Sequence, residues 1–225
     1  MRITFLAVPC LVAGLFAASA LAVVNPFTET FSGPTSNWST ASVLTAPTYI
    51  PTGGPDGSSF ARGSFAFTNS VNGDFPILFR GQDNFSSSSN SFVGNWLASG
   101  VTTFSFSVRH NAPSSLDFFA RFSSGGPGVV SLQPTLVPAG VWTTFNVPIN
   151  ASTPFIFEGG PSLYTSTFSA LTRVQIGFVV DAATAGQAGP YTFDIDNVSI
   201  TPAPGAAATF LGAAALAGFH RRRTR

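Results

Sequence analysis

The chain has 225 residues and a formal net charge of +1, and all ten of its basic residues are arginines. Five arginines lie near the two ends, so residues 23–201 carry five arginines against nine acids, a net charge of −4. An acidic, lysine-free surface excludes the clustered positive charge that nucleic-acid binding requires. The single cysteine, Cys10, lies in the first 22 residues, which excludes disulfides and cysteine-ligated zinc from the rest of the chain.

The first 22 residues have the three regions of a secretory signal peptide. Arg2 supplies a short positive region, residues 5–18 form an apolar core, and residues 20–22 (Ala-Leu-Ala) form a small-residue cleavage site. The apolar run is short for a bilayer span, which argues against an N-terminal membrane anchor. We therefore expect cleavage after Ala22 and an exported chain that begins at Val23.

Residues 23–201 consist of short alternating segments bounded by Gly, Pro, Ser and Asn, a pattern that predicts β-strands. In 101–109, for example, Phe104, Phe106 and Val108 share one face. Further strands are expected at 116–122, 141–149 and 173–180, and weaker ones at 43–50, 60–67, 77–80, 129–132 and 191–200. Half-buried strands joined by turn-rich loops predict an all-β domain, an antiparallel β-sandwich, with one helical turn in 163–171.

The residues that could carry catalysis form no recognisable set. His110, the one histidine of residues 23–201, follows a predicted strand and is expected to be a solvated turn residue. No serine lies in a nucleophile-elbow sequence, so a catalytic triad is not indicated. Glycoside hydrolysis needs two carboxyl groups across one bond, and the sequence leaves that alternative open. The candidate acids are Glu29, Asp117, Glu158, Asp194 and Asp196.

The last predicted strand changes the parity of its apolar residues at Asp196-Asn197. The apolar positions are 191, 193 and 195 before this point, and 198 and 200 after it, which predicts a bulge. From parity alone, Asp194 and Asp196 would both point outward into solvent. The carboxylate and amide oxygens at the bulge are also of the type that a hard cation such as Ca²⁺ prefers.

Three segments carry a family resemblance. They are residues 27–33 (FTETFSG) followed by Trp38, residues 139–145 (AGVWTTF), and residues 193–198 (FDIDNV). These segments resemble strands of jelly-roll carbohydrate-binding modules or of laminin-type sandwich domains. In such modules an acid near the first strand and an aspartate in the last often share a structural calcium ion. The resemblance therefore implies Glu29 and Asp196 as calcium ligands.

Sugar binding requires aromatic platforms with polar groups beside them. Tyr49, Trp96 and Tyr164 lie in or near predicted loops and are the ligand-binding candidates, although burial is the commoner role of a large aromatic residue. Trp38 and Trp142 are expected at the edge of the core. We expect a non-catalytic protein that binds extracellular polysaccharide or forms part of a surface matrix. The alternatives are a secreted glycan-active hydrolase and a structural surface protein without a ligand.

The last 24 residues contain a Pro-x-Pro motif, an apolar run over 206–219 and an arginine cluster, in that order. This order resembles the PEP-CTERM sorting signal of bacterial exported proteins, with alanine in place of the family's glutamate. The resemblance implies processing by an exosortase-like enzyme, transient or stable membrane anchoring, and a location in the cell envelope or extracellular matrix. The expected division is 1–22, 23–201 and 202–225. The sorting residues are Pro202, Ala203, Pro204, Arg221, Arg222 and Arg223.

Overall fold

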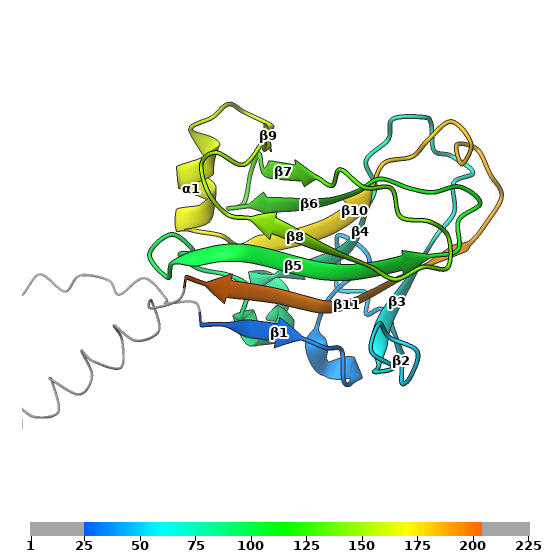
Figure 1. The fold of residues 1–225 in the computed structure, drawn as a ribbon, viewed down its shortest axis with the longest axis horizontal. Helices are drawn as coiled ribbons and strands as arrows, with labels where there is room; N and C mark the ends of the chain where they lie inside the picture. Colours follow the sequence, from blue (N-terminus) through cyan, green and yellow to red (C-terminus); the bar gives the residue numbers. More distant parts are fainter. Residues whose placement is uncertain (1–24, 204–225) are drawn as a thin grey trace, which may run out of the picture.

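The computed structural model describes residues 25–203 as two antiparallel β-sheets packed face to face (Figure 1). One sheet has the strand order β2-β3-β11-β5-β8, with β1 also paired to β11, and the other has the order β4-β10-β6-β7-β9. The predicted antiparallel sandwich is thus confirmed. The expected signal peptide and the tail beyond Ala203 lie outside the described residues.

The strands match the strongly alternating segments most closely. The six-stranded sheet contains β1 (Phe27–Glu29), β2 (Thr48–Ile50), β3 (Phe60–Phe65), β5 (Val101–His110), β8 (Thr143–Pro148) and β11 (Tyr191–Pro202). The five-stranded sheet contains β4 (Ile77–Gln82), β6 (Phe118–Ser123), β7 (Val129–Leu132), β9 (Ile156–Phe157) and β10 (Arg173–Phe178). The expected helical turn is α1 (Leu163–Ser169), and three short 3₁₀ helices are η1 (Pro34–Ser36), η2 (Asp83–Phe85) and η3 (Ser87–Asn90).

The strand expected at 43–50 is reduced to its last three residues. The hydroxyl of Ser39 donates to the carbonyl of Val43 at 2.6 Å and accepts the amide of Thr45 at 2.8 Å. A side chain that binds the backbone in this way replaces the hydrogen bonds of a sheet ladder. The segment therefore forms a turn, and Val43 is left 69% exposed.

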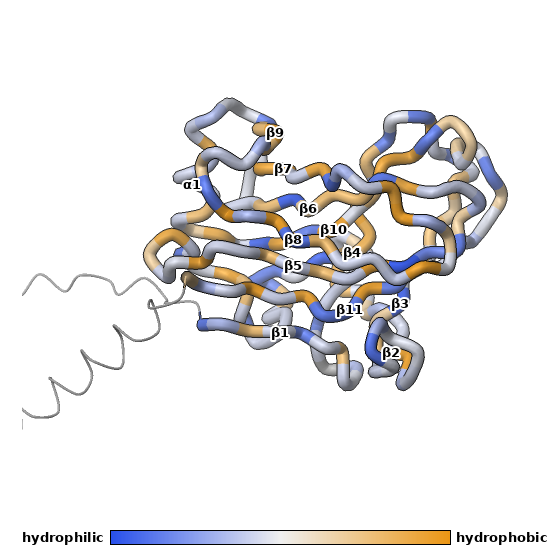
Figure 2. The backbone as a smooth tube through the Cα atoms, viewed as in Figure 1, coloured by the Kyte–Doolittle hydropathy of each residue, from blue (hydrophilic) through white to orange (hydrophobic). Residues whose placement is uncertain are grey.

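The core lies between the two sheets and is largely aromatic. Phe104 on β5 contacts Phe122 on β6 edge-on, with ring centroids 5.3 Å apart, and both side chains are fully buried. Phe178 on β10 stacks on Phe193 of β11 at 4.6 Å. These residues occupy the inward faces that the alternation predicted, and Figure 2 shows apolar and polar residues alternating along the strands.

His110 is a core residue, so the prediction of a solvated turn histidine was wrong. Its side chain ends β5 and is only 2% exposed, stacked on Phe193 at 5.8 Å. Nδ1 accepts the amide of Ala112 at 3.1 Å, and Nε2 lies 2.8 Å from the carbonyl of Val137. Burial lowers the pKa of His110. The neutral imidazole, with one donor and one acceptor nitrogen, satisfies both contacts.

The sandwich extends slightly beyond the expected boundary at residue 201. Pro202 ends β11 opposite Val101, and the amide of Ala203 donates to the carbonyl of Gly100 at 2.8 Å. The first two residues of the Pro-x-Pro motif are therefore fixed to the domain. Within residues 25–203, none of the helices has the length and apolar character needed to cross a bilayer.

Candidate functional site

The predicted bulge in β11 is present at Asp196-Asn197. The pairing of β11 with β5 shifts register between Asp196 and Ser199, and Asn197 has a left-handed φ of 49°. Before the bulge, β11 pairs with β3, and after it with β1. The bulge therefore lies where the strand exchanges one neighbour for another, and it turns Val198 back toward the core.

Asp194 and Asp196 lie on the outer face of the sheet, as parity predicted, but the expectation that they would be solvated was wrong for both. They are 2% and 0% exposed, because the loop over residues 51–59 covers the outer face of the sheet around them. Asp194 receives two hydrogen bonds from Arg62, at 2.6 and 3.0 Å, and two from Arg109, at 2.7 and 2.9 Å. Two arginines thus compensate one buried carboxylate.

Arg109, together with Trp142, also holds the covering loop in place. Gly53 accepts hydrogen bonds on its carbonyl oxygen from Arg109 at 3.2 Å and from the indole of Trp142 at 2.9 Å. The Arg109 guanidinium lies over the rings of Trp142 and Phe60, at 4.7 and 5.1 Å from their centroids. Trp142 therefore packs on the outer face of the sheet and not at the edge of the inter-sheet core.

Asp196 has no such compensation. Its carboxylate accepts hydrogen bonds from the Ser58 hydroxyl at 3.0 Å and from the amide of Asn197 at 2.8 Å, and no arginine pairs with it. Burial raises the pKa of Asp196 to about 6; these two hydrogen bonds oppose the rise, and the negative charges of Asp56 and Glu29 add to it. At neutral pH the folded protein holds an ionised, buried carboxylate without a positive partner among the described residues.

Glu29 lies within electrostatic reach of Asp196 but has its own hydrogen bonds. Its oxygens accept the amide of Phe31 at 2.8 Å and the hydroxyl of Ser88 at 2.7 Å. No group of three or more acidic, histidine or cysteine side chains in residues 25–203 is arranged to hold a metal ion. The donors around Asp196 still fit a hard cation in chemistry and charge. Backbone or water oxygens would have to complete its coordination.

Trp96 cannot serve as a ligand platform, because it is fully buried. Its ring stacks on Phe168 at 5.9 Å, and its indole nitrogen donates to the carbonyl of Phe92 at 3.1 Å. Trp38 is equally buried and belongs to the core proper. Neither ring has a face open to solvent.

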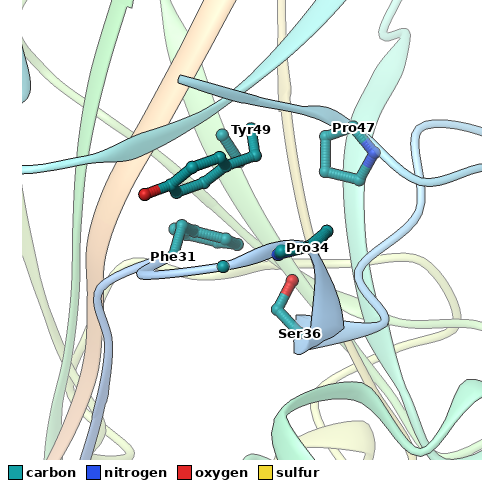
Figure 3. A pocket seen from close by; sticks show the side chains of 7 residues that line it. Phe31, Pro34, Ser36, Pro47 and Tyr49 are labelled. Carbon is teal, nitrogen blue, oxygen red and sulfur yellow. The ribbon is translucent and has the colours of Figure 1, made fainter. Parts of the chain in front are cut away.

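The two tyrosine candidates lie far apart. Tyr49 on β2 borders a pocket of only about 10 Å³, with Pro47 beside it and Phe31, Pro34 and Ser36 across from it (Figure 3). Tyr164 on α1 packs against Phe168 at 5.1 Å. Since α1 and β2 lie at opposite corners of the sandwich (Figure 1), no single site contains both residues.

A groove on the outer face of the five-stranded sheet was missed by sequence reasoning. We call it the sheet-face groove; it measures about 350 Å³ and is lined by Phe75, Ile77, Phe119, Arg121, Val130, Ile156 and Glu158. Strand register places Arg121 between Gln175 and Val130, and Val130 beside Ile156, in one row across four strands. Phe75 is 54% exposed, and its ring packs against that of Phe119, with the ring centroids 5.7 Å apart.

Gly177 allows the Phe119 ring to lie against the sheet. A Cβ atom at Gly177 would lie 2.5 Å from the Phe119 ring and 2.2 Å from the carbonyl of Pro76, closer than atoms can approach. The floor of the groove is therefore an aromatic ring over a glycine. The alternation in the sequence did place Phe119 and Arg121 together on the outward side of their strand. Alternation alone, however, does not show that this outward face forms a groove.

The polar end of the groove is an ion pair. Arg121 donates two hydrogen bonds of 2.6 Å to Glu158 and one of 2.5 Å to the side-chain oxygen of Gln175. The amide of Gly128 also donates to Glu158. Hydrogen bonding from Arg121 lowers the pKa of Glu158. The pair fixes both side chains in a defined orientation at the edge of an apolar surface.

Neither a protein-family model nor a curated protein sequence matches this chain. Several solved structures, however, are similar to this chain. The family 11 carbohydrate-binding module of a Clostridium thermocellum cellulosomal cellulase has a TM-score of 0.50 at 14% identity, over 81% of this chain and 97% of that one. An exo-beta-agarase gives 0.52 at 10% identity, over 78% of this chain. The N-terminal part of C. thermocellum endo-1,4-beta-D-xylanase 10B gives 0.47 at 16%, over 79% of this chain.

This chain spans nearly the whole family 11 module, but only 25% and 28% of the agarase and xylanase chains. At such identities the similarity is one of fold. The described domain thus has the two-sheet sandwich of carbohydrate-binding modules, which confirms that part of the family resemblance.

The buried charge of Asp196 predicts an unusual pH dependence in the presence of a chelator. The unfolded carboxyl loses its proton near pH 3.8, whereas the folded protein retains it to about pH 6. The resulting stabilisation is complete below pH 3.8 and is lost as the pH rises through 6, and we expect it to be on the order of 1 to 3 kcal/mol.

Urea unfolding at pH 4 and pH 7 measures this contribution as the difference between the wild-type protein and Asp196→Asn. The variant should gain stability relative to wild type as the pH rises. The surface variant Asp83→Asn is the control and should follow the wild type. Equal pH dependence in Asp196→Asn and wild type would contradict the assignment.

Proposed function

We propose that this chain is an exported, non-catalytic carbohydrate-binding module whose ligand lies in the sheet-face groove. The observation that carries the proposal is the groove itself: an exposed Phe75 beside a fixed Arg121–Glu158 pair, on a fold similar to that of carbohydrate-binding modules. Apolar ring surfaces stack on the aromatic face of a sugar site, and fixed polar groups at its edge orient the hydroxyls.

The geometry favours binding over hydrolysis. A general acid needs a raised pKa, whereas the Arg121 ion pair lowers that of Glu158. Asp194 is paired with two arginines, Arg62 and Arg109. Asp196 and Glu29 each accept a hydrogen bond from a different serine, Ser58 and Ser88. A structural surface protein without a ligand remains the second candidate, and a binding measurement separates the two.

Phe75→Ala should weaken glycan binding at least about tenfold, because the lost aromatic contact is worth about 1.4 kcal/mol. Affinity electrophoresis against mixed-linkage β-glucan, xylan, agarose and soluble cellulose derivatives identifies the ligand and measures the loss. Because Phe75 is 54% exposed, the variant should keep its melting temperature.

The matched control is Val43→Ala, which removes an exposed apolar side chain that does not line the groove. Absence of binding to every glycan would favour the structural alternative. Release of reducing sugar from any of them would favour a hydrolase.

We further propose that one Ca²⁺ ion binds at Asp196, with Glu29 contributing at least its charge. The cation would neutralise the buried carboxylate and stabilise the loop that covers it. At a Ca²⁺ concentration one hundred times Kd, linkage adds about 2.7 kcal/mol, or roughly 5–10 °C in melting temperature. Asp196→Asn should abolish this shift and Glu29→Gln should reduce it. An unchanged melting temperature of the wild-type protein in excess Ca²⁺ would contradict the proposal.

The proposed destination is the bacterial cell envelope or extracellular matrix, reached through signal-peptide cleavage after Ala22 and exosortase-like processing of the tail. This rests on the sequence resemblance, since Ala22 and the tail beyond Ala203 lie outside the described residues. Mass spectrometry of the exported protein should show a new N-terminus at Val23 and loss of the terminal arginine cluster. An intact Arg225 in the mature protein would refute processing.

A further inference from the structure

A second pocket lies at the opposite sheet, beside the edge strand β1. It measures about 250 Å³ and is lined by residues from β1, η1, η3 and their flanks. We call it the serine pocket; its principal lining residues are Phe27, Glu29, Ser32, Ser36, Ser88 and Ser89. Its walls are mostly polar, unlike those of the sheet-face groove, and no lysine or arginine lines it.

A buried hydrogen-bond chain fixes one wall of the pocket. The indole nitrogen of the fully buried Trp38 donates to the Ser88 hydroxyl at 2.8 Å. Because that oxygen accepts from Trp38, its own proton points to Glu29, whose carboxylate accepts it at 2.7 Å. Glu29 also accepts the amide of Phe31. The carboxylate is thereby held rigidly, with lone pairs still available on both oxygens.

Three further serine hydroxyls in the pocket make no hydrogen bond within the described residues. No hydrogen bond within residues 25–203 uses the side chains of Ser32, Ser36 or Ser89, and each hydroxyl can both donate and accept. The segment that carries Ser89 is also held in an unfavourable backbone conformation. Ser88, Ser89 and Asn90 have φ values of 49°, 54° and 64°, in the left-handed region that residues other than glycine seldom occupy.

We propose that the serine pocket binds one neutral pyranose residue, with a vicinal pair of sugar hydroxyls donating to Glu29. Ser32, Ser36 and Ser89 would exchange hydrogen bonds with the remaining hydroxyls, and Phe27, which is half-buried, would contact an apolar ring face. The carboxylate and the absence of basic lining residues exclude anionic sugars. The volume is below that of ordinary small-molecule sites, which suits a single ring and not a chain.

This site is separate from the sheet-face groove, because β1 belongs to the six-stranded sheet and the groove lies on the five-stranded one. The inference goes beyond the proposed function and does not require it. A protein with both sites could hold a polysaccharide in the groove and a single sugar residue of another chain in the pocket.

Gly33 offers a way to block the pocket without distorting it. Gly33 lines the pocket in an extended conformation, with a φ of −171°, and a Cβ atom there would meet nothing within 4 Å. Gly33→Leu should therefore fill the space at little cost to stability. Gly126→Leu is the matched control, because a Cβ atom at Gly126, in the loop between β6 and β7 of the other sheet, also meets nothing within 4 Å.

The test is an NMR titration with the methyl glycosides of glucose, galactose and mannose, in EDTA to exclude bound cations. At least one glycoside should shift the amide signals of Phe27, Ser88 and Ser89 with a Kd in the millimolar range. Gly33→Leu should abolish the shifts, and Gly126→Leu should leave them unchanged. Phe75→Ala should also leave them unchanged. Loss of glycan binding in the groove and loss of sugar binding in the serine pocket can therefore be told apart.

Ser36→Val provides a second blocking variant if Gly33→Leu does not fold. The proposal is overturned if no glycoside shifts these signals, or if both blocking variants bind as the wild type does. It is equally overturned if binding appears only when Ca²⁺ replaces EDTA, which would make the pocket a cation site.

Discussion

Burial of charge on β11 is the constraint on which the outer face of the six-stranded sheet depends. Asp194 and Asp196 alternate with core residues of the same strand, so packing the core forces both carboxylates outward, under the loop over 51–59. Asp194 is neutralised by Arg62 and Arg109. Asp196 is not, and its pKa rises to about 6. One strand therefore carries a buried carboxylate that two arginines compensate and, two residues away, a buried carboxylate without such compensation.

Arg109 also connects this charge to the loop. Arg109 pairs with Asp194, stacks on Trp142 and donates to Gly53, so one side chain joins strand, aromatic ring and loop. The loop in turn brings Ser58 to Asp196. A cation at Asp196 would neutralise the carboxylate to which Ser58 attaches this loop. The proposed calcium ion would therefore have a structural role, separate from the binding of a ligand.

The two candidate ligand sites use different chemistry because the two sheets expose different surfaces. The five-stranded sheet presents an apolar row with a fixed ion pair at one end, and its aromatic floor exists because Gly177 leaves room for Phe119. The β1 edge presents hydroxyls and a carboxylate instead. There the Ser88 hydroxyl, which accepts the indole N–H of Trp38, donates to Glu29 and fixes its carboxylate.

The sequence by itself determined the sandwich, most strand positions and the bulge at Asp196, because a period of two and its interruption are local properties of the chain. It could not determine which outward-facing residues become covered. His110, Asp194 and Asp196 are buried by segments distant in sequence. Trp96 lies in a loop, yet its side chain packs in the core. The sheet-face groove likewise depends on register across β10, β6, β7 and β9, which only the tertiary structure decides, since strand order and register are set by packing between segments far apart in the chain.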